Sequence, residues 1–182
     1  MINGVELTFE TDGDMFSPLA VDKGTLAMLN SVEFAVGDKV LDLGCGYGVV
    51  GIYAAKLIGG NSVVMNDIDE KCIELSKKNA ELNGVGDAMV ILSDGFNNIR
   101  EGDFTLILSN PPYHADFKIP KHFIEKGFNR LKIGGRMYMV TKRADWYKNK
   151  FAAIFGGVKV IEKDGYYIFR AEKRSMNYAN KK

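Results

Sequence analysis

The sequence predicts an α/β protein in which a mostly parallel sheet is covered by helices on both faces. From about residue 39, short apolar runs alternate with segments whose apolar residues recur every three or four positions. A chain that repeats strand and helix in this way builds parallel strands, because each helix carries the chain back across the sheet. In addition, a glycine-rich turn over residues 42–48 directly follows the first strand and opens into a helix.

The individual elements follow from these runs. Strands are expected over residues 39–43, 62–66, 88–92, 104–109 and 136–141. Amphipathic helices are expected over residues 49–57, 70–83 and 121–131, and residues 21–32 should form a helix that lies against the sheet. A fifth helix, after the strand at 136–141, should pack through Trp146 and Tyr147.

The C-terminal part of the chain has a different pattern. Residues 158–162 and 166–171 are two further strand-like runs, joined by Lys163, Asp164 and Gly165. An Asp-Gly pair between two such runs is typical of a tight β-hairpin. The parallel sheet is therefore expected to end in an antiparallel hairpin.

Length and composition predict one soluble domain. The 182 residues suffice for a sizeable core and contain no internal repeat or linker. We expect residues 1–36 to form an N-terminal segment with a helix packed on the sheet, and residues 37–182 to form the core. The sequence shows no signal-peptide pattern and no apolar run of membrane-spanning length. A cytoplasmic protein without membrane association, as a monomer or homodimer, is therefore expected.

Charge and metal-ligand content narrow the possible functions. The 24 basic and 23 acidic residues leave the chain nearly neutral, so binding to nucleic acid would need a local basic patch. The two cysteines, Cys45 and Cys72, and the two histidines lack the spacing of a metal site. We therefore expect no metal.

The glycine turn predicts a ligand site, and the acidic residue before the glycines indicates the kind of ligand. Gly46, Gly48 and Gly51 fit the dinucleotide pattern G-x-G-x-x-G, so a nicotinamide-dependent dehydrogenase is one hypothesis. Asp42, however, would repel a pyrophosphate and attract an ammonium group. S-Adenosylmethionine carries an amino group, a carboxylate and a sulfonium but no phosphate, and it is therefore the expected cofactor.

Two more carboxylates are predicted to meet the same ligand. Asp67 ends the second strand about 20 residues after the glycines, where a ribose diol would bind. Asp94 follows the third strand, where it could accept a hydrogen bond from an adenine amino group. Because the carboxyl ends of parallel strands meet at one edge of a sheet, these acids should gather around one site.

The residues Asn110, Pro111, Pro112 and Tyr113 follow the fourth strand and predict the chemistry. The prolines stiffen the loop and keep their carbonyl acceptors. The oxygens of Asn110 and Pro111 would accept from the two N–H groups of an amine conjugated to a planar π system. Tyr113 would stack on the plane of that system. The predicted reaction is methyl transfer to a planar nitrogen, driven by alignment of the lone pair with the methyl group.

Other residues are candidates for contact with the substrate. His114 follows the motif and could contact the substrate or a phosphate. Lys142 and Arg143, with Lys148 and Lys150, could contact a phosphate backbone. A solvated helix face is the alternative explanation for these cations.

At these positions the chain resembles the class I S-adenosylmethionine-dependent methyltransferases. Within that class it is similar to the methyltransferase small domain family, which includes ribosomal RNA guanine-N2 methyltransferases. The resemblance covers nearly the whole chain. It is carried by Phe16 and Ser17 with Asp22, Gly24 and Thr25, by residues 40–46 and 110–112, and by residues 154–156 and 164–171 near the end.

The resemblance implies a seven-stranded sheet of order 3-2-1-4-5-7-6, with strand seven antiparallel. It also implies roles: Asp42, Gly44 and Gly46 hold the methionine end of the cofactor, Asp67 the ribose and Asp94 the adenine. Cys45, Gly48, Ile68, Gly95 and Asn110 complete the expected cofactor site, and Phe16, Ser17, His114, Lys142 and Arg143 are the expected substrate contacts. The implied reaction is methylation of guanine N2 in ribosomal RNA or a ribosomal subunit.

Two departures from the family keep other substrates open. Enterobacterial ribosomal members carry an additional N-terminal domain that this sequence lacks, and Ala115-Asp116-Phe117 replaces a small, glycine-containing stretch. Glutamine-N5 methyltransferases of release factors and adenine-N6 methyltransferases of tRNA or DNA share the Asn-Pro-Pro-Tyr motif. A non-catalytic RNA-binding module could have the same fold, but it would not need that motif.

Overall fold

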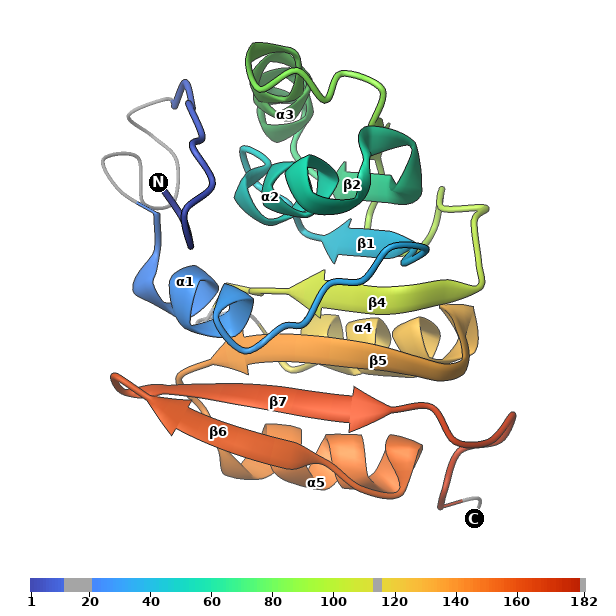
Figure 1. The fold of residues 1–182 in the computed structure, drawn as a ribbon. Coiled ribbons are helices and arrows are strands. Elements are labelled where there is room, and N and C mark those ends of the chain that lie inside the picture. The colour runs from blue at the N-terminus through green and yellow to red at the C-terminus, as the bar shows by residue number, and fades with distance from the viewer. Residues whose placement is uncertain (12–20, 113–115, 181–182) are drawn as a thin grey trace.

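The computed structural model describes residues 1–11, 21–112 and 116–180, and its centre is a seven-stranded sheet (Figure 1). The strands are β1 (Val40–Leu43), β2 (Val63–Asp67), β3 (Met89–Leu92), β4 (Phe104–Ser109), β5 (Leu131–Thr141), β6 (Lys159–Lys163) and β7 (Tyr166–Glu172). Their order is β3-β2-β1-β4-β5-β7-β6, and β7 runs antiparallel to both of its neighbours. The sheet implied by the family resemblance is thereby confirmed.

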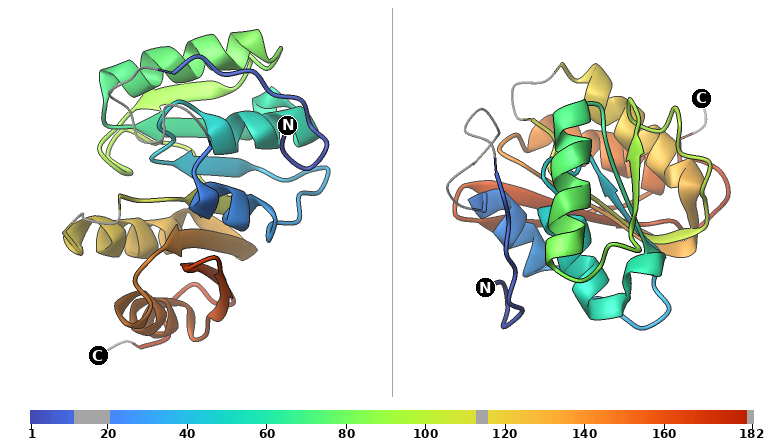
Figure 2. Two further views of the ribbon diagram at one scale, coloured as in Figure 1. Left: turned by 90° about the vertical axis from the view of Figure 1, so that its left-hand side faces the viewer. Right: turned by 90° about the horizontal axis from the view of Figure 1, so that it is seen from above.

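Helices cover both faces of this sheet (Figure 2). They are α1 (Lys23–Leu29), α2 (Val49–Ile58), the short 3-10 helix η1 (Gly60–Ser62), α3 (Glu70–Leu82), α4 (Lys118–Arg130) and α5 (Asp145–Phe155). Side chains alternate between the two faces along a strand. Thus Leu106 and Leu108 of β4 join the core under α1, α2 and α3, whereas Ile107 joins the core under α4 and α5. Within the described residues, no helix is both long and apolar enough to cross a membrane.

Three elements differ by more than one residue from the bounds expected. β5 begins at Leu131 rather than at residue 136, because Leu131 already pairs with Phe104 before a β-bulge shifts the register. Gly134 in this stretch has a φ of +80°, which interrupts the regular strand pattern. α4 begins at Lys118 rather than at residue 121, since Pro120 lies in the first turn, where its missing N–H costs no helical bond. α1 is shorter than the expected helix over 21–32.

The expected hairpin is present between β6 and β7. Its connection consists of Asp164 and Gly165, which both have positive φ, 52° and 78°. A two-residue turn of type I′ requires positive φ at both central positions. The turn brings β7 back between β5 and β6, and it places Tyr166, at the start of β7, beside α1.

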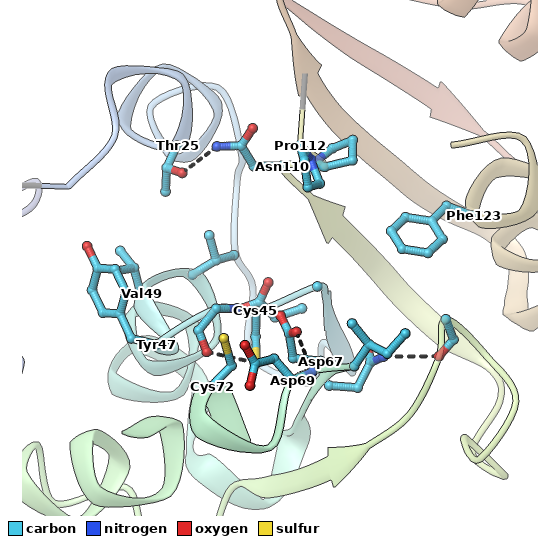
Figure 3. A pocket seen from close by; sticks show the side chains of 18 of the residues that line it. Thr25, Cys45, Tyr47, Val49, Asp67, Asp69, Cys72, Asn110, Pro112 and Phe123 are labelled. Carbon is cyan, nitrogen blue, oxygen red and sulfur yellow. Dashed lines mark hydrogen bonds between the residues drawn. The ribbon is translucent and has the colours of Figure 1, made fainter. Parts of the chain in front are cut away.

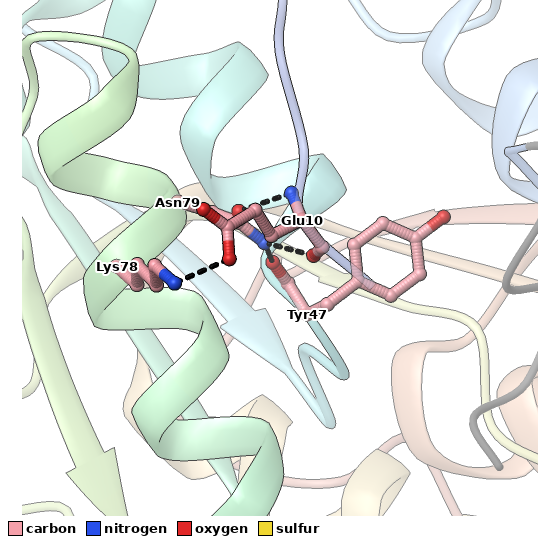
Figure 4. Close-up of polar contacts among 4 residues, drawn as sticks. All are labelled: Glu10, Tyr47, Lys78 and Asn79. Carbon is pink, nitrogen blue, oxygen red and sulfur yellow. Dashed lines mark hydrogen bonds and ion pairs between the residues drawn. The ribbon is translucent and has the colours of Figure 1, made fainter. Parts of the chain in front are cut away.

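Asn79 of α3, drawn in Figure 4, and Asn83, the C-cap of α3, bind the N-terminal segment. Asn79 accepts from the backbone N–H of Glu10 and donates to its carbonyl, at 2.8 and 3.0 Å. Asn83 makes the same pair of bonds with Thr8, at 3.0 and 2.7 Å. Four residues of a helix rise about 6 Å and two residues of extended chain span about 6.6 Å, so the two spacings match. Lys78 adds an ion pair with Glu10.

Candidate functional site

A pocket of about 520 Å³ lies at the carboxyl-terminal edge of β1, β2, β3 and β4 (Figure 3). This volume is in the range that holds small-molecule ligands. Its lining includes the predicted site residues Asp42, Gly44, Cys45, Gly46, Asp67, Ile68, Asp94, Gly95, Asn110, Pro111 and Pro112. The structure therefore brings together the glycine turn, the three carboxylates and the start of the Asn-Pro-Pro-Tyr motif.

The glycine turn is held in place by the neighbouring strand β2. The carbonyl of Asn66 accepts from the N–H groups of Gly44 and Cys45, at 2.9 and 2.8 Å. Oδ2 of Asp67 accepts from the N–H of Gly46 at 2.9 Å. Gly46 has a φ of +55°, which other residues adopt only at a cost. Asp67 thus has a structural role in addition to the ligand contact predicted for it.

Gly48 lies at the end of this turn but does not belong to the pocket lining. It caps the N-terminus of α2 with a φ of +96°, and a Cβ at this position would lie 2.9 Å from Cδ1 of Ile52 and 3.2 Å from Oγ of Ser76. The carbonyl of Tyr47, just before it, accepts from Asn79 at 2.9 Å. Gly48 therefore helps to fix the shape of the turn without lining the pocket.

Asp42 lies buried beneath the start of α2. Its side chain is 2% exposed, and its Oδ2 accepts from the N–H of Gly51 at 2.8 Å. A larger residue than Gly51 would not fit, because a Cβ would lie 2.3 Å from Cγ of Met65. Burial is the main cause that raises the pKa of Asp42 to about 7, and the negative charge of Asp67 also raises it. The hydrogen bond from Gly51 lowers the pKa, but its effect is smaller than that of burial. A cation bound beside Asp42 would favour its ionised form.

The burial of Asp42 predicts that the stability of the ligand-free protein depends on pH. The ordinary pKa of 3.8 applies in the unfolded chain, whereas the folded protein keeps the proton up to about pH 7. Between these values the folded state binds more protons, so the free energy of unfolding falls as the pH rises. Relative to Asp42→Asn, we expect the wild-type Tm to fall between about pH 4 and about pH 7. A Tm difference that does not change with pH in calorimetry would contradict the raised pKa.

The pocket has an acidic lining. Its carboxyl groups come from Asp22, Asp42, Asp67, Asp69 and Asp94, and Lys71 contributes an ammonium group. The resulting negative potential favours a ligand with positive charge and disfavours a pyrophosphate. The electrostatics of the site therefore argue against the dinucleotide alternative and fit the ammonium and sulfonium of S-adenosylmethionine.

Asn66 positions the loop that carries Asp94. Its Nδ2 donates to the carbonyls of Ser93 and Gly95, which flank Asp94, at 3.3 and 3.0 Å. Its Oδ1 is buried and has no hydrogen-bond partner in the described part of the chain. Sequence reasoning missed Asn66, because an asparagine within a buried strand has no local pattern that indicates a ligand site.

The two cysteines of the pocket are thiols near neutral pH. Burial raises the pKa of Cys45 well above its usual range and the pKa of Cys72 to about 12, with nearby carboxylates adding to both effects. A thiolate is the nucleophilic form of cysteine. The site is therefore suited to direct transfer between two bound molecules, without a covalent cysteine intermediate.

Asn110 follows β4, and hydrogen bonds define the orientation of its side-chain amide. Nδ2 donates to Oδ2 of Asp22 and to Oγ1 of Thr25, both at 2.9 Å; the second bond is drawn in Figure 3. Oδ1 is buried, and no described residue donates to it. A buried acceptor without a partner costs about 1–3 kcal/mol. An N–H donor on a bound ligand would relieve this cost.

Two of the remaining predicted site residues lie away from the pocket, and four lie outside the described residues. Lys142 and Arg143 are exposed and do not line it. The ammonium of Lys142 lies 5.0 Å from the ring centroid of Tyr166, and the guanidinium of Arg143 lies 5.0 Å from that of Phe117. The last four, Phe16, Ser17, Tyr113 and His114, lie outside the described residues.

Several pocket residues had no predicted role in the site. Asp22 and Thr25 of the N-terminal segment line it, although the sequence indicated only that they match the family. Tyr47 and Phe123 line it too, and Figure 3 shows the ring of Phe123 on the same side as Pro112. Apolar periodicity marks such aromatic residues as core, so it could not separate pocket walls from packed interior.

The fold and the site together define a class I S-adenosylmethionine-dependent methyltransferase. Residues 6–170 match the family model "Methyltransferase small domain", and the chain belongs to this family. The membership confirms the resemblance inferred from the glycine turn, the Asn-Pro-Pro motif and the closing hairpin.

Individual relatives are similar over most of this chain. YbxB of Bacillus subtilis, called an uncharacterized protein, is 34% identical over 92% of this chain and 87% of its own length. The ribosomal RNA small subunit methyltransferase C of Pseudoalteromonas atlantica is 31% identical over 81% of this chain and 43% of its own. A Thermus thermophilus 16S rRNA N2 methyltransferase, in complex with AdoMet and guanosine, has a TM-score of 0.87 and 28% identity over 95% of this chain and 49% of its own. The chain thus spans about half the length of these two ribosomal RNA methyltransferases.

Proposed function

We propose that this protein transfers the methyl group of S-adenosylmethionine to an exocyclic amine of an RNA base, with guanine N2 of ribosomal RNA as the target. The observation that carries the proposal is the buried Oδ1 of Asn110, unpartnered among the described residues, at a pocket with an acidic lining. The relatives named as ribosomal RNA methyltransferases support the substrate class.

The residues present fit the cofactor by charge and by hydrogen-bonding type. Asp42 and the turn at Gly44 and Gly46 would hold the methionine end, where the buried carboxyl group of Asp42 would attract the ammonium. Asp67 would hold the ribose hydroxyls. The loop Asp94-Gly95 and Ile68 would hold the adenine, and Cys45 would line the site beside the glycine turn. When bound, S-adenosylmethionine supplies an electrophilic methyl group.

The Asn-Pro-Pro motif would prepare the substrate nitrogen. Oδ1 of Asn110 would accept one N–H of the amine and the carbonyl of Pro111 the other. Two such acceptors favour a tetrahedral nitrogen whose lone pair is directed at the methyl group. The negative end of the Asn110 amide would also stabilise the positive charge that develops on the nitrogen. A strong general base is not needed, since the alkylated nitrogen is itself acidic and would lose its proton to water.

An aromatic and cationic cluster is the proposed contact for the RNA. Phe117 stacks on Trp146 with ring centroids 4.6 Å apart, and the guanidinium of Arg143 lies over Phe117. Such a combination binds single-stranded nucleic acid by stacking and by contact with phosphate. Lys142, which lies beside Arg143 in sequence, would add a second cation. We propose that a nucleotide flanking the target base binds here.

We also propose that residues 1–182 act as one domain. α1, from the N-terminal segment, packs against β5 and β7. It also contributes Thr25 to the pocket, and Asp22 directly precedes it. The N-terminal segment would then be part of the catalytic unit rather than a separate module.

The substrate is tested by methyl transfer from tritiated S-adenosylmethionine to separate pools. The pools are undermethylated ribosomal subunits, free ribosomal RNA, tRNA, DNA and a release factor. We expect label in a ribosomal pool, and nucleoside analysis should identify N2-methylguanosine. Label only in tRNA, DNA or the release factor would keep the reaction and overturn the substrate. If no pool is labelled and calorimetry detects no cofactor binding, the proposed function is wrong.

A further inference from the structure

The amide of Asn110 has both of its N–H donors engaged before any substrate binds. One bond goes to Oδ2 of Asp22 and the other to Oγ1 of Thr25, each at 2.9 Å. These partners precede Asn110 by 88 and 85 positions in the chain. The oxygen that remains, Oδ1, is buried with no donor among the described residues. The proposed function needs this orientation, because only Oδ1 can accept an N–H from an amine.

Of the two partners, only Asp22 can dictate which way the amide faces. A carboxylate accepts hydrogen bonds and cannot donate them, so Nδ2 must face it. The opposite orientation would place Oδ1 of Asn110 against Oδ2 of Asp22 and lose the bond. Thr25 carries a hydroxyl, which donates or accepts as required. Thr25 therefore supports either orientation, and Asp22 supports one.

Further hydrogen bonds hold Asp22 itself. Its Oδ2 accepts from the backbone N–H of Thr25 at 3.0 Å, so that it serves as the N-cap of α1. Its Oδ1 accepts from the hydroxyl of Tyr166, in β7, at 3.4 Å. Position 24 requires glycine, since a Cβ there would lie 2.7 Å from the Tyr166 ring and 2.8 Å from Oδ2 of Asp22. The carboxylate thus joins α1, β7 and the end of β4.

We propose that Asp22 is a positioning residue for the methyl transfer, which acts by holding the Asn110 amide with Oδ1 free for the substrate amine. The negative charge also polarises the amide, which makes Oδ1 a stronger acceptor as positive charge develops on the nitrogen. This inference rests on the proposed N-methyl transfer. It adds to it a residue outside the Asn-Pro-Pro-Tyr motif.

The first test needs no substrate. In ¹⁵N–¹H spectra, the side-chain NH₂ of Asn110 is identified by its absence in Asn110→Ala. We expect its protons to exchange with solvent at least about tenfold more slowly than those of exposed Asn129, because both N–H groups of Asn110 are in part-buried hydrogen bonds, whereas the bond from Asn129 to Tyr178 is exposed. We expect Asp22→Asn to reduce that protection. Equal exchange of the two side chains in the wild type would overturn the proposal, whatever the protein methylates.

The second test uses turnover. Asn is as good an N-cap as Asp, so Asp22→Asn keeps the cap of α1 but replaces the charge-assisted hydrogen bond to the Asn110 amide by a weaker, neutral one. We expect kcat to fall by about 10- to 100-fold, with KM and cofactor Kd changed less than about threefold. Asp87→Asn is the matched control, since this exposed carboxylate accepts from the N–H of Asn61 away from the pocket. The control should keep the wild-type kcat.

A double mutant separates positioning from general damage. If Asp22 acts through Asn110, Asp22→Asn should cause no further loss in the Asn110→Ala background. An equal loss in both backgrounds would overturn the proposal, as would a wild-type kcat in Asp22→Asn alone. A loss confined to cofactor Kd would also overturn it and assign Asp22 to the pocket wall. If the wild type is inactive but its Asn110 amide is protected from exchange, this counts against the proposed function. The inferred orientation of the amide would still stand.

Discussion

Replacement of Asn110 by alanine is expected to lower kcat by about 10²- to 10³-fold, the usual effect of removing a preorganised acceptor or donor from a reacting centre. The truncated side chain would lose Oδ1, a buried acceptor to which no described residue donates. The cofactor Kd should change by only about two- to threefold, since the proposed cofactor contacts come from the glycine turn and the carboxylates. Single-turnover kinetics with saturating cofactor, together with calorimetry, measures the two quantities separately.

A matched variant controls for the loss of an amide. Asn129→Ala removes an exposed side chain of α4, away from the pocket, which donates to the hydroxyl of Tyr178. This variant should keep the wild-type kcat. Wild-type turnover in Asn110→Ala would remove Asn110 from the mechanism. A large rise in cofactor Kd would instead place its main role in cofactor binding.

Replacement of Asp67 by alanine is expected to raise the cofactor Kd by about 10- to 100-fold. A hydrogen bond to a charged group contributes about 1.5–3 kcal/mol, and each 1.4 kcal/mol is a factor of ten. The effect has two sources. The carboxylate would lose the ribose hydroxyls, and the glycine turn would lose the bond from the N–H of Gly46 to Oδ2. Calorimetric titration with S-adenosylhomocysteine measures the sum.

A deoxy analogue separates these two sources. If Asp67 binds the ribose, 2′-deoxy S-adenosylhomocysteine should bind the wild type about tenfold more weakly than the parent compound. In Asp67→Ala the two compounds should bind alike. Asp87→Ala, which removes a carboxylate far from the pocket, should reproduce the wild-type discrimination. The same discrimination in Asp67→Ala as in the wild type would show that the ribose lies elsewhere.

Local patterns in the sequence were sufficient for the elements and for the parts of the site that lie on single loops. Strand β4 was placed without error, and the Asp164-Gly165 turn was predicted, because positive φ at both positions strongly favours that pair. The glycine turn and residues 110–112 were located for the same reason: a tight turn or a stiff loop requires particular residues at adjacent positions. Their convergence followed from the rule that parallel strands end at one edge.

Contacts between distant segments were not accessible in this way. The start of β5 at Leu131 depends on pairing with Phe104 across a bulge, and the pattern of residues 131–135 alone suggests only the end of a helix. The pKa of Asp42 depends on burial under α2, which no spacing of residues encodes. The role of Asn79 and Asn83 in holding the N-terminal segment became visible only from their hydrogen bonds with Thr8 and Glu10.

The division has a physical basis. Backbone preferences, turn chemistry and apolar periodicity act over a few residues, so the sequence by itself determined the α/β class, the order of the elements and the two motifs that define the family. The orientation of the Asn110 amide is a property of packing, because it depends on Asp22 being brought across the sheet to the end of β4. Only the tertiary structure decided which atom of Asn110 is left free, and the proposed chemistry depends on that atom.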